Sequence, residues 1–112
     1  MVEYITIGKK QYPVRIGYYV MKKVQEKTGL SLAKALQEHK EDIALHETVL
    51  FAALKMGAYA EGTELDLTEE DMPMCLDLCF AQYMKLFTSD KFFPEVDEPG
   101  KPEEEPKKSK EN

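Results

Sequence analysis

A chain of 112 residues is long enough for one domain with a modest hydrophobic core, so we expect one core rather than two lobes. Its 15 basic and 21 acidic residues give a net charge of −6, and no Lys/Arg cluster is positioned to neutralise a phosphate backbone, which argues against nucleic acid as a partner. No apolar leader follows Met1 and no apolar run reaches roughly 18 residues. We therefore expect a cytoplasmic protein without a membrane span.

Residues 3–16 predict a short β-hairpin. Polar and apolar residues alternate over 3–7, Gly8-Lys9-Lys10 supplies a turn, and residues 11–16 resume an extended pattern. The apolar residues on one side of this second strand are Tyr12, Val14 and Ile16. Pro13 has no N–H to give to a strand ladder, so the second strand should be an edge or should present this position outward. Two strands are marginal alone and must pack on helices.

Two short helices are expected next. The apolar spacing predicts a helix over residues 18–28 that ends at Gly29, where glycine suits a left-handed cap. Ser31 can then cap a second helix over about 32–40. The residues of this second helix that should face inward are Leu32, Ala33 and Leu36. Because the connection is tight, the two helices should be neighbours at an angle.

Two longer helices follow. A helix over about residues 42–60 has a wide apolar arc, so it belongs near the centre of the fold. The arc consists of Ile43, Leu45, Val49, Leu50, Ala53, Leu54, Met56, Gly57 and Ala60. The last helix ends near Phe87, but two N-caps are open, Thr68 and Asp71. Pro73 bears on this choice, because proline is tolerated in the first turn of a helix and disruptive further in.

The segment from Met72 to Phe87 is too apolar for an ordinary surface helix, so it needs cover on more than one side. At about 100° per residue, one stripe should face the chain's own core. This stripe consists of Met72, Cys75, Leu76, Cys79, Phe80, Tyr83, Leu86 and Phe87. A weaker back face consists of Met74, Leu78, Ala81 and Met84. We predict that the back face binds a partner, because exposed apolar patches mark interaction sites and methionine adapts to varied apolar surfaces.

From Pro94 onward the composition changes. Prolines interrupt a stretch that is dense in Glu and Lys and cannot bury enough apolar surface to offset the entropy of ordering. We therefore predict a folded domain over residues 1–93 and a disordered acidic tail over residues 94–112. The predicted fold class is α+β but mainly α, with an N-terminal β-hairpin packed on about four helices.

No residue pattern predicts catalysis, a metal or a cofactor. Cys75 and Cys79 are four residues apart, and either His39 or His46 would have to complete a zinc site. Their row of Met, Leu and Phe neighbours favours buried free thiols instead. His46 lies in an apolar arc without a nucleophile nearby, which favours a buried, hydrogen-bonded histidine over a catalytic one. The carboxylates at 69–71 suit a helix start, where negative charge is stabilised.

Five segments occur in an order that resembles a known family. They are the turn Gly8-Lys9-Lys10, the segment Tyr12-Pro13-Val14-Arg15-Ile16-Gly17, the helix end Glu26-Lys27-Thr28-Gly29-Leu30-Ser31-Leu32, the helical segment Leu50-Phe51-Ala52-Ala53-Leu54 and the helix start Leu67-Thr68-Glu69-Glu70-Asp71. Over about residues 3–90 this order resembles the tail assembly chaperones of long-tailed bacteriophages and prophages. The motifs are turn, cap and packing signals rather than a chemical signature.

The resemblance implies a small, mainly helical, non-enzymatic protein in the cytoplasm of the bacterial host. Such a protein coats the helical tape-measure protein and keeps it soluble before the tail tube polymerises around it. The expected partners are thus the tape-measure protein and, secondarily, the tail tube protein, with a homo-oligomer left open. Two alternatives remain: a structural tail or head-completion subunit that stays in the particle, and a small metal-binding regulatory domain.

Overall fold

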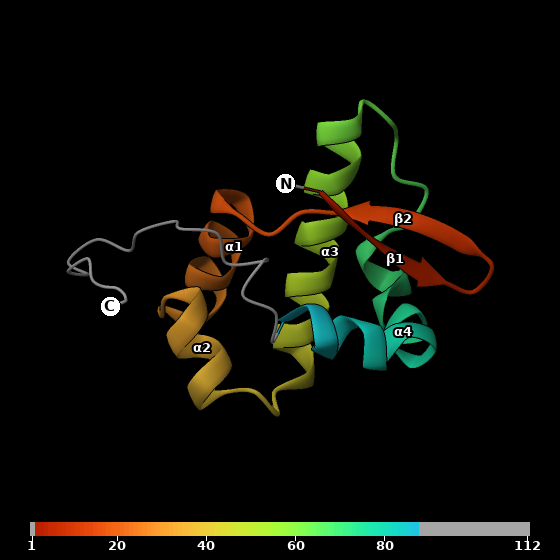
Figure 1. Ribbon diagram of the computed structural model, residues 1–112. Helices are drawn as coiled ribbons and strands as arrows, with labels where there is room; N and C mark the ends of the chain where they lie inside the picture. The colour runs from red at the N-terminus through yellow and green to blue at the C-terminus, as the bar shows by residue number, and fades with distance from the viewer. Residues whose placement is uncertain (1, 88–112) are drawn as a thin grey trace, which may run out of the picture.

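The computed structural model describes residues 2–87, which form a β-hairpin followed by four α-helices (Figure 1). The elements are β1 (Glu3–Ile7), β2 (Lys10–Val14), α1 (Tyr18–Thr28), α2 (Leu32–Glu38), α3 (Ile43–Glu61), a short 3-10 helix η1 (Glu69–Asp71) and α4 (Met72–Phe87). The predicted fold class, mainly helical with an N-terminal hairpin, is therefore confirmed. The predicted domain boundary at 93/94 and the tail over 94–112 lie outside the described residues.

The hairpin closes through a two-residue loop, with Ile7 paired to Lys10. Gly8 has a φ of 67°, and no residue other than glycine has a positive φ in the described chain. A positive φ at the first loop position alone is the pattern of a type II′ turn, in which glycine belongs at that position. The alternation of the strands places four side chains in the core, Ile5, Ile7, Tyr12 and Val14.

Helix α3 is the central element, with α1 and α2 to one side and the hairpin and α4 to the other (Figure 1). Strand β2 approaches α3 so closely that backbone meets backbone. A Cβ atom built on Gly57 would lie 2.0 Å from the carbonyl oxygen of Pro13 and 2.6 Å from the Cα of Val14. Just beyond the strand, the backbone N–H of Arg15 donates to the carbonyl of Ala53, at 3.0 Å. The hairpin is thus seated directly on α3.

The outer edge of β1 is bonded to α4 by a side chain. The Gln82 amide accepts from the Thr6 N–H at 2.9 Å and donates to the Thr6 carbonyl at 2.8 Å. Since both backbone groups of Thr6 point out of the ladder, Thr6 and its partner Gln11 form a non-hydrogen-bonded pair. Pro13, two residues along, occupies the same kind of position, so its missing N–H costs the ladder nothing. The predicted outward placement of Pro13 has this physical basis.

The end of helix α1 and the start of helix α2 are as their local sequences predict. Gly29, with a φ of 77°, caps α1 in the left-handed conformation, and the Ser31 hydroxyl accepts from the Lys34 N–H at 3.2 Å at the start of α2. Leu32 is buried, but the prediction for Ala33 was wrong. Ala33 is exposed and Ala35 is buried in its place, because the inward face of this two-turn helix follows residues 32 and 35.

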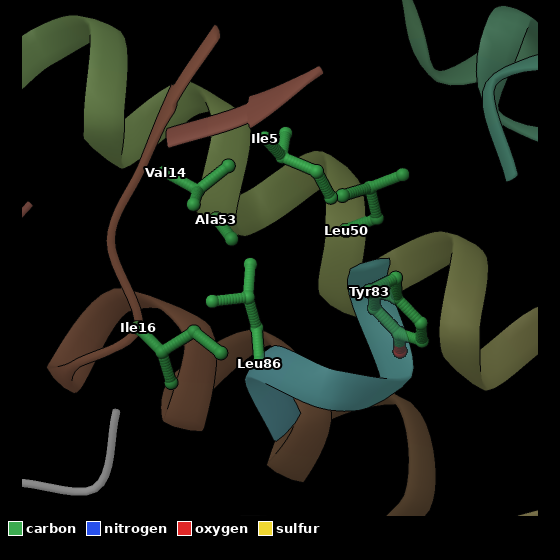
Figure 2. Close-up of a pocket in the computed structure, with 7 residues that line it drawn as sticks. All are labelled: Ile5, Val14, Ile16, Leu50, Ala53, Tyr83 and Leu86. Atoms are coloured by element: carbon green, nitrogen blue, oxygen red, sulfur yellow. The ribbon is translucent and has the colours of Figure 1, made fainter. Parts of the chain in front are cut away.

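A small apolar void lies where the hairpin, α3 and α4 meet (Figure 2). It is lined by Ile5, Val14, Ile16, Leu50, Ala53, Tyr83 and Leu86. Its volume of about 10 Å³ is close to the minimum for one water molecule, and an apolar cavity of this kind stays dry. We interpret it as a packing gap rather than a binding site.

None of the helices formed by residues 2–87 combines the length and the hydrophobicity needed to cross a bilayer.

The contact at Gly57 generates the first prediction. Gly57→Ala should destabilise the fold by about 2–3 kcal/mol, because the added methyl group forces β2 away from α3 and this cost exceeds the roughly 1 kcal/mol by which alanine is favoured in a helix. Urea denaturation measures the difference. Gly17→Ala is the control, since a Cβ there would lie 3.9 Å from the nearest atom. Equal stability of the two variants would contradict the close-contact interpretation.

Loss of the bond between Gln82 and Thr6 should expose the edge of β1. We expect Gln82→Ala to lower the free energy of unfolding by about 1–2 kcal/mol, because two hydrogen bonds are lost at a site where water can replace them in part. Amide hydrogen exchange at Thr6 should become faster in this variant. Gln11→Ala, which alters an exposed side chain on the partner strand, is the control and should leave that exchange rate unchanged.

Candidate functional site

Helix α4 is preceded by a short 3-10 turn, which begins with a capping box formed by Thr68 and Asp71. The Asp71 carboxylate accepts from the Thr68 N–H at 2.8 Å and from the Thr68 hydroxyl at 3.1 Å, which closes the 3-10 turn η1. The α-helix then starts at Met72, so Pro73 is its second residue and lies in the first turn. Thr68 and Asp71 therefore act together, and Pro73 fits without breaking a helical hydrogen bond.

The helix is kinked in its middle. Cys79 has a φ of −132° and a ψ of 17°, outside the helical region, although no proline or glycine lies at this point. The part after the kink is bonded to other elements on two sides, through Gln82 to β1 and through Tyr83 to α3. These two contacts fix the direction of the second half of α4. A face calculated for a straight helix is therefore interrupted at Cys79.

The stripe predicted to face the core is buried in most of its length, with one correction. Phe80 was predicted to be buried, but 49% of it is exposed. It follows directly after the kink at Cys79 and lines a surface groove rather than the core. The buried members are Met72, Cys75, Leu76, Cys79 and Tyr83, and Leu86 is half-buried, while the prediction for the Phe87 side chain lies outside what the structure describes.

The residues predicted to bind a partner are placed unequally. Met74 is 74% exposed and Leu78 is 60% exposed, and Leu78 lies beside the hairpin turn, about 4.0 Å from where a Cβ on Gly8 would be. Ala81 is exposed as well. Met84, beyond the kink, is half-buried and packs against the core. The exposed part of the back face therefore comprises Met74, Leu78 and Ala81.

A groove lies between the start of α3 and the first half of α4, and none of the three exposed back-face residues lines it. It has a volume of about 540 Å³ and is open to solvent along its length. The lining consists of Lys40, Glu41, Ile43, His46, Pro73, Leu76, Asp77 and Phe80. Ile43 is 71% exposed and, with Phe80, gives the groove large apolar side chains on both helices. Sequence reasoning missed this groove, because it assigned both residues to buried faces.

His46 forms the floor of the groove and connects three segments. It is 5% exposed, its Nε2 contacts the backbone carbonyl of Lys40, and its Nδ1 lies 2.8 Å from the Tyr83 hydroxyl. A carbonyl can only accept, so in the neutral ring Nε2 carries the proton and Nδ1 accepts from Tyr83. The rings of Tyr83 and Phe80 meet the imidazole edge to face, with centroids at 5.4 Å and 6.2 Å. The predicted buried, hydrogen-bonded histidine is confirmed.

Three buried groups near the groove, the thiols of Cys75 and Cys79 and the hydroxyl of Tyr83, are held in their neutral forms. Burial raises the pKa of the Cys79 thiol from 9.0 to about 11, with the nearby Cys75 adding to the shift. Burial also raises the pKa of Cys75, and that of the Tyr83 hydroxyl lies far above its usual range for the same reason. A thiol reacts as its thiolate, so these cysteines are packing residues rather than nucleophiles. The predicted buried, free thiols are confirmed.

The zinc site considered for the cysteines is not assembled in the described part of the chain. Among residues 2–87, no three His, Cys, Asp or Glu side chains come together as metal ligands. His39 is exposed at the end of α2, while His46 bonds to Lys40 and Tyr83.

A second surface pocket, of about 420 Å³, lies at the far end of α3. It is lined by Phe51, Lys55, Ala58, Tyr59, Thr63, Glu64, Leu65 and Leu67, and Tyr59 is 80% exposed. This pocket lies at the opposite end of α3 from the groove. Substitutions here can therefore serve as controls for substitutions in the groove.

The raised pKa of Cys79 predicts an alkaline loss of stability. The unfolded thiol ionises near pH 9 while the folded thiol stays neutral, so the stabilisation is complete below pH 9 and falls as the pH rises toward 11. We expect Cys79 to account for about 1–2 kcal/mol of this loss. Urea denaturation at pH 8 to 10.5 should show a flatter pH profile for Cys79→Ala than for the native chain. Identical profiles would contradict the assignment.

Comparisons of the chain with protein-family models, with curated proteins and with solved structures gave no match.

Proposed function

We propose that this protein is a non-enzymatic tail assembly chaperone of a long-tailed phage or prophage. It acts in the cytoplasm of the bacterial host, where it binds the helical tape-measure protein and keeps it soluble until the tail tube assembles. The tail tube protein is a second candidate partner. The observation that carries the proposal is the exposure of large apolar side chains on α4, Met74 and Leu78 above all.

These side chains have the properties that transient capture of a helix requires. Met74 and Leu78 are one turn apart on the straight first half of α4, so they form a ridge that can pack against an apolar stripe on another helix. The groove lined by Ile43 and Phe80 is a second exposed apolar surface, formed by other residues of α4. Large exposed apolar side chains clustered in this way mark interaction sites rather than ordinary surface.

A ridge and groove of this size suit reversible binding. Association costs both molecules translational and rotational entropy, and a small interface offsets this cost by only a little. The binding free energy is therefore small, so the complex can dissociate when the tail tube displaces the chaperone. Methionine adds adaptability, because its unbranched thioether side chain can repack against different apolar surfaces along a long partner. The chain can thereby bind many similar apolar sites along its partner, even where the partner's amino-acid sequence differs from site to site.

Co-expression with the tape-measure protein tests the proposal. The native chain should raise the soluble fraction of that protein several-fold and co-purify with it. The double variant Met74→Asp/Leu78→Asp should lose most of this effect, because burying two carboxylates against an apolar stripe is unfavourable. The matched control is Tyr18→Asp/Tyr59→Asp, which changes two residues that are 78% and 80% exposed elsewhere on the surface. Circular dichroism should show that both double variants are folded.

Two results would contradict the proposal. One is a tape-measure protein that neither co-purifies with the native chain nor becomes more soluble. The other is detection of the chain in purified phage particles by mass spectrometry, since a chaperone should be absent there and a structural tail or head-completion subunit should be present.

A further inference from the structure

The groove between α3 and α4 has an apolar lining that also includes the negatively charged side chains of Glu41 and Asp77. We propose that it binds an amphipathic helix in which lysine or arginine lies one turn from a bulky apolar residue. This inference deepens the proposed function, because it rests on that function for the helical nature of the partner and adds the chemistry that the partner must present.

The apolar part of the groove is suited to one or two large side chains. Ile43 from α3 and Phe80 from α4 project from the two helices, while Leu76 and Pro73 continue the apolar lining along α4. The floor is rigid, because His46 is hydrogen-bonded on both ring nitrogens and meets Phe80 edge to face. The volume of about 540 Å³ is within the range of sites that hold ligands, and the open shape favours a chain that lies across it.

Negative charge is concentrated on the two segments that frame the groove. Residues 38–47 and 69–80 contain eight carboxylates and one lysine, whereas the chain as a whole has a net charge of −6. The carboxylates are Glu38, Glu41, Asp42, Glu47, Glu69, Glu70, Asp71 and Asp77. Outside these two segments the chain has a net charge of +1, although residues 94–112 also contain seven carboxylates and four lysines.

Two of these carboxylates line the groove, where they outnumber the cations by two to one. Glu41 and Asp77 form no ion pair within residues 2–87, in contrast to Asp66, which binds Lys10 at 2.8 Å. Lys40 is the one cation on the lining. A purely apolar helix seated in the groove would take water from Glu41 and Asp77 and leave them unpaired, which is unfavourable. A partner with lysine or arginine at its flanks replaces that water with charge-assisted contacts.

Two synthetic helical peptides test this inference directly. Both carry Leu and Phe one turn apart, and they differ in having either Lys or Glu at the flanking positions. Fluorescence anisotropy with the full chain should show that the Lys peptide binds roughly tenfold more tightly at low salt. The preference should shrink as salt is added, because salt screens exposed charges.

Charge reversal in the groove separates its effect from that of acidic residues elsewhere. Glu41→Lys/Asp77→Lys should abolish or reverse the preference between the two peptides. The control, Glu64→Lys, alters an exposed carboxylate at the far end of α3 and should leave most of the preference in place. Phe80→Ser should weaken both peptides about equally, whereas Tyr59→Ser should weaken neither.

The outcomes distinguish this inference from the proposed function. Equal binding of the two peptides overturns the inference, while rescue of the tape-measure protein would still support the chaperone proposal. Charge preference that survives Glu41→Lys/Asp77→Lys also overturns it, because the preference would then arise outside the groove. If Phe80→Ser changes the molar mass measured by light scattering, the occupant is a second copy of the chain and the inference fails.

Discussion

The fold depends on the contact between the backbone of β2 and helix α3. At Gly57 the absence of a side chain allows the strand to lie on the helix, and the bond from Arg15 to Ala53 holds it there. A two-stranded sheet gains little stability by itself. Seated on α3, however, it delivers the apolar side chains of both strands to the core, and it provides the edge to which α4 is bonded.

The position of α4 follows from this packing of the hairpin on α3. Gln82 bonds to β1 and Tyr83 bonds to His46 on α3, so the second half of the helix is fixed by two elements that already lie side by side. The first half continues in a different direction from the kink at Cys79. This division separates a part of α4 that closes the core from a part that presents Met74 and Leu78 to solvent.

Local patterns in the sequence were sufficient to predict the hairpin, the helices and most of their ends. The left-handed glycines and the capping side chains act on residues within a few positions, so their effect can be read from short segments. Gly8, Gly29 and Gly62 each have a positive φ where the chain turns or a helix ends, and Asp42 caps α3 through two backbone N–H groups. Most of the buried stripe of α4 likewise follows from helical periodicity.

The candidate site was harder to predict because it depends on contacts between distant residues. Gln82 and Thr6 are 76 positions apart, and His46 and Tyr83 are 37 apart. A periodicity calculation assumes a straight helix, so it could not show that Phe80 leaves the core after the kink. It also placed Ile43 on the apolar arc, but Ile43 is in the first turn of α3 and remains exposed.

The side-chain amide of Gln82 also closes part of the sheet edge to backbone pairing. A bare strand edge is a template on which another extended chain can add by backbone pairing, which leads to aggregation. On β1 that template is occupied at Thr6, and on β2 it is weakened by Pro13 and by the bond of Arg15 to α3. Both edges of the hairpin are thus partly closed to the addition of an extended segment by backbone pairing, although a two-stranded sheet has no other strands to cover it.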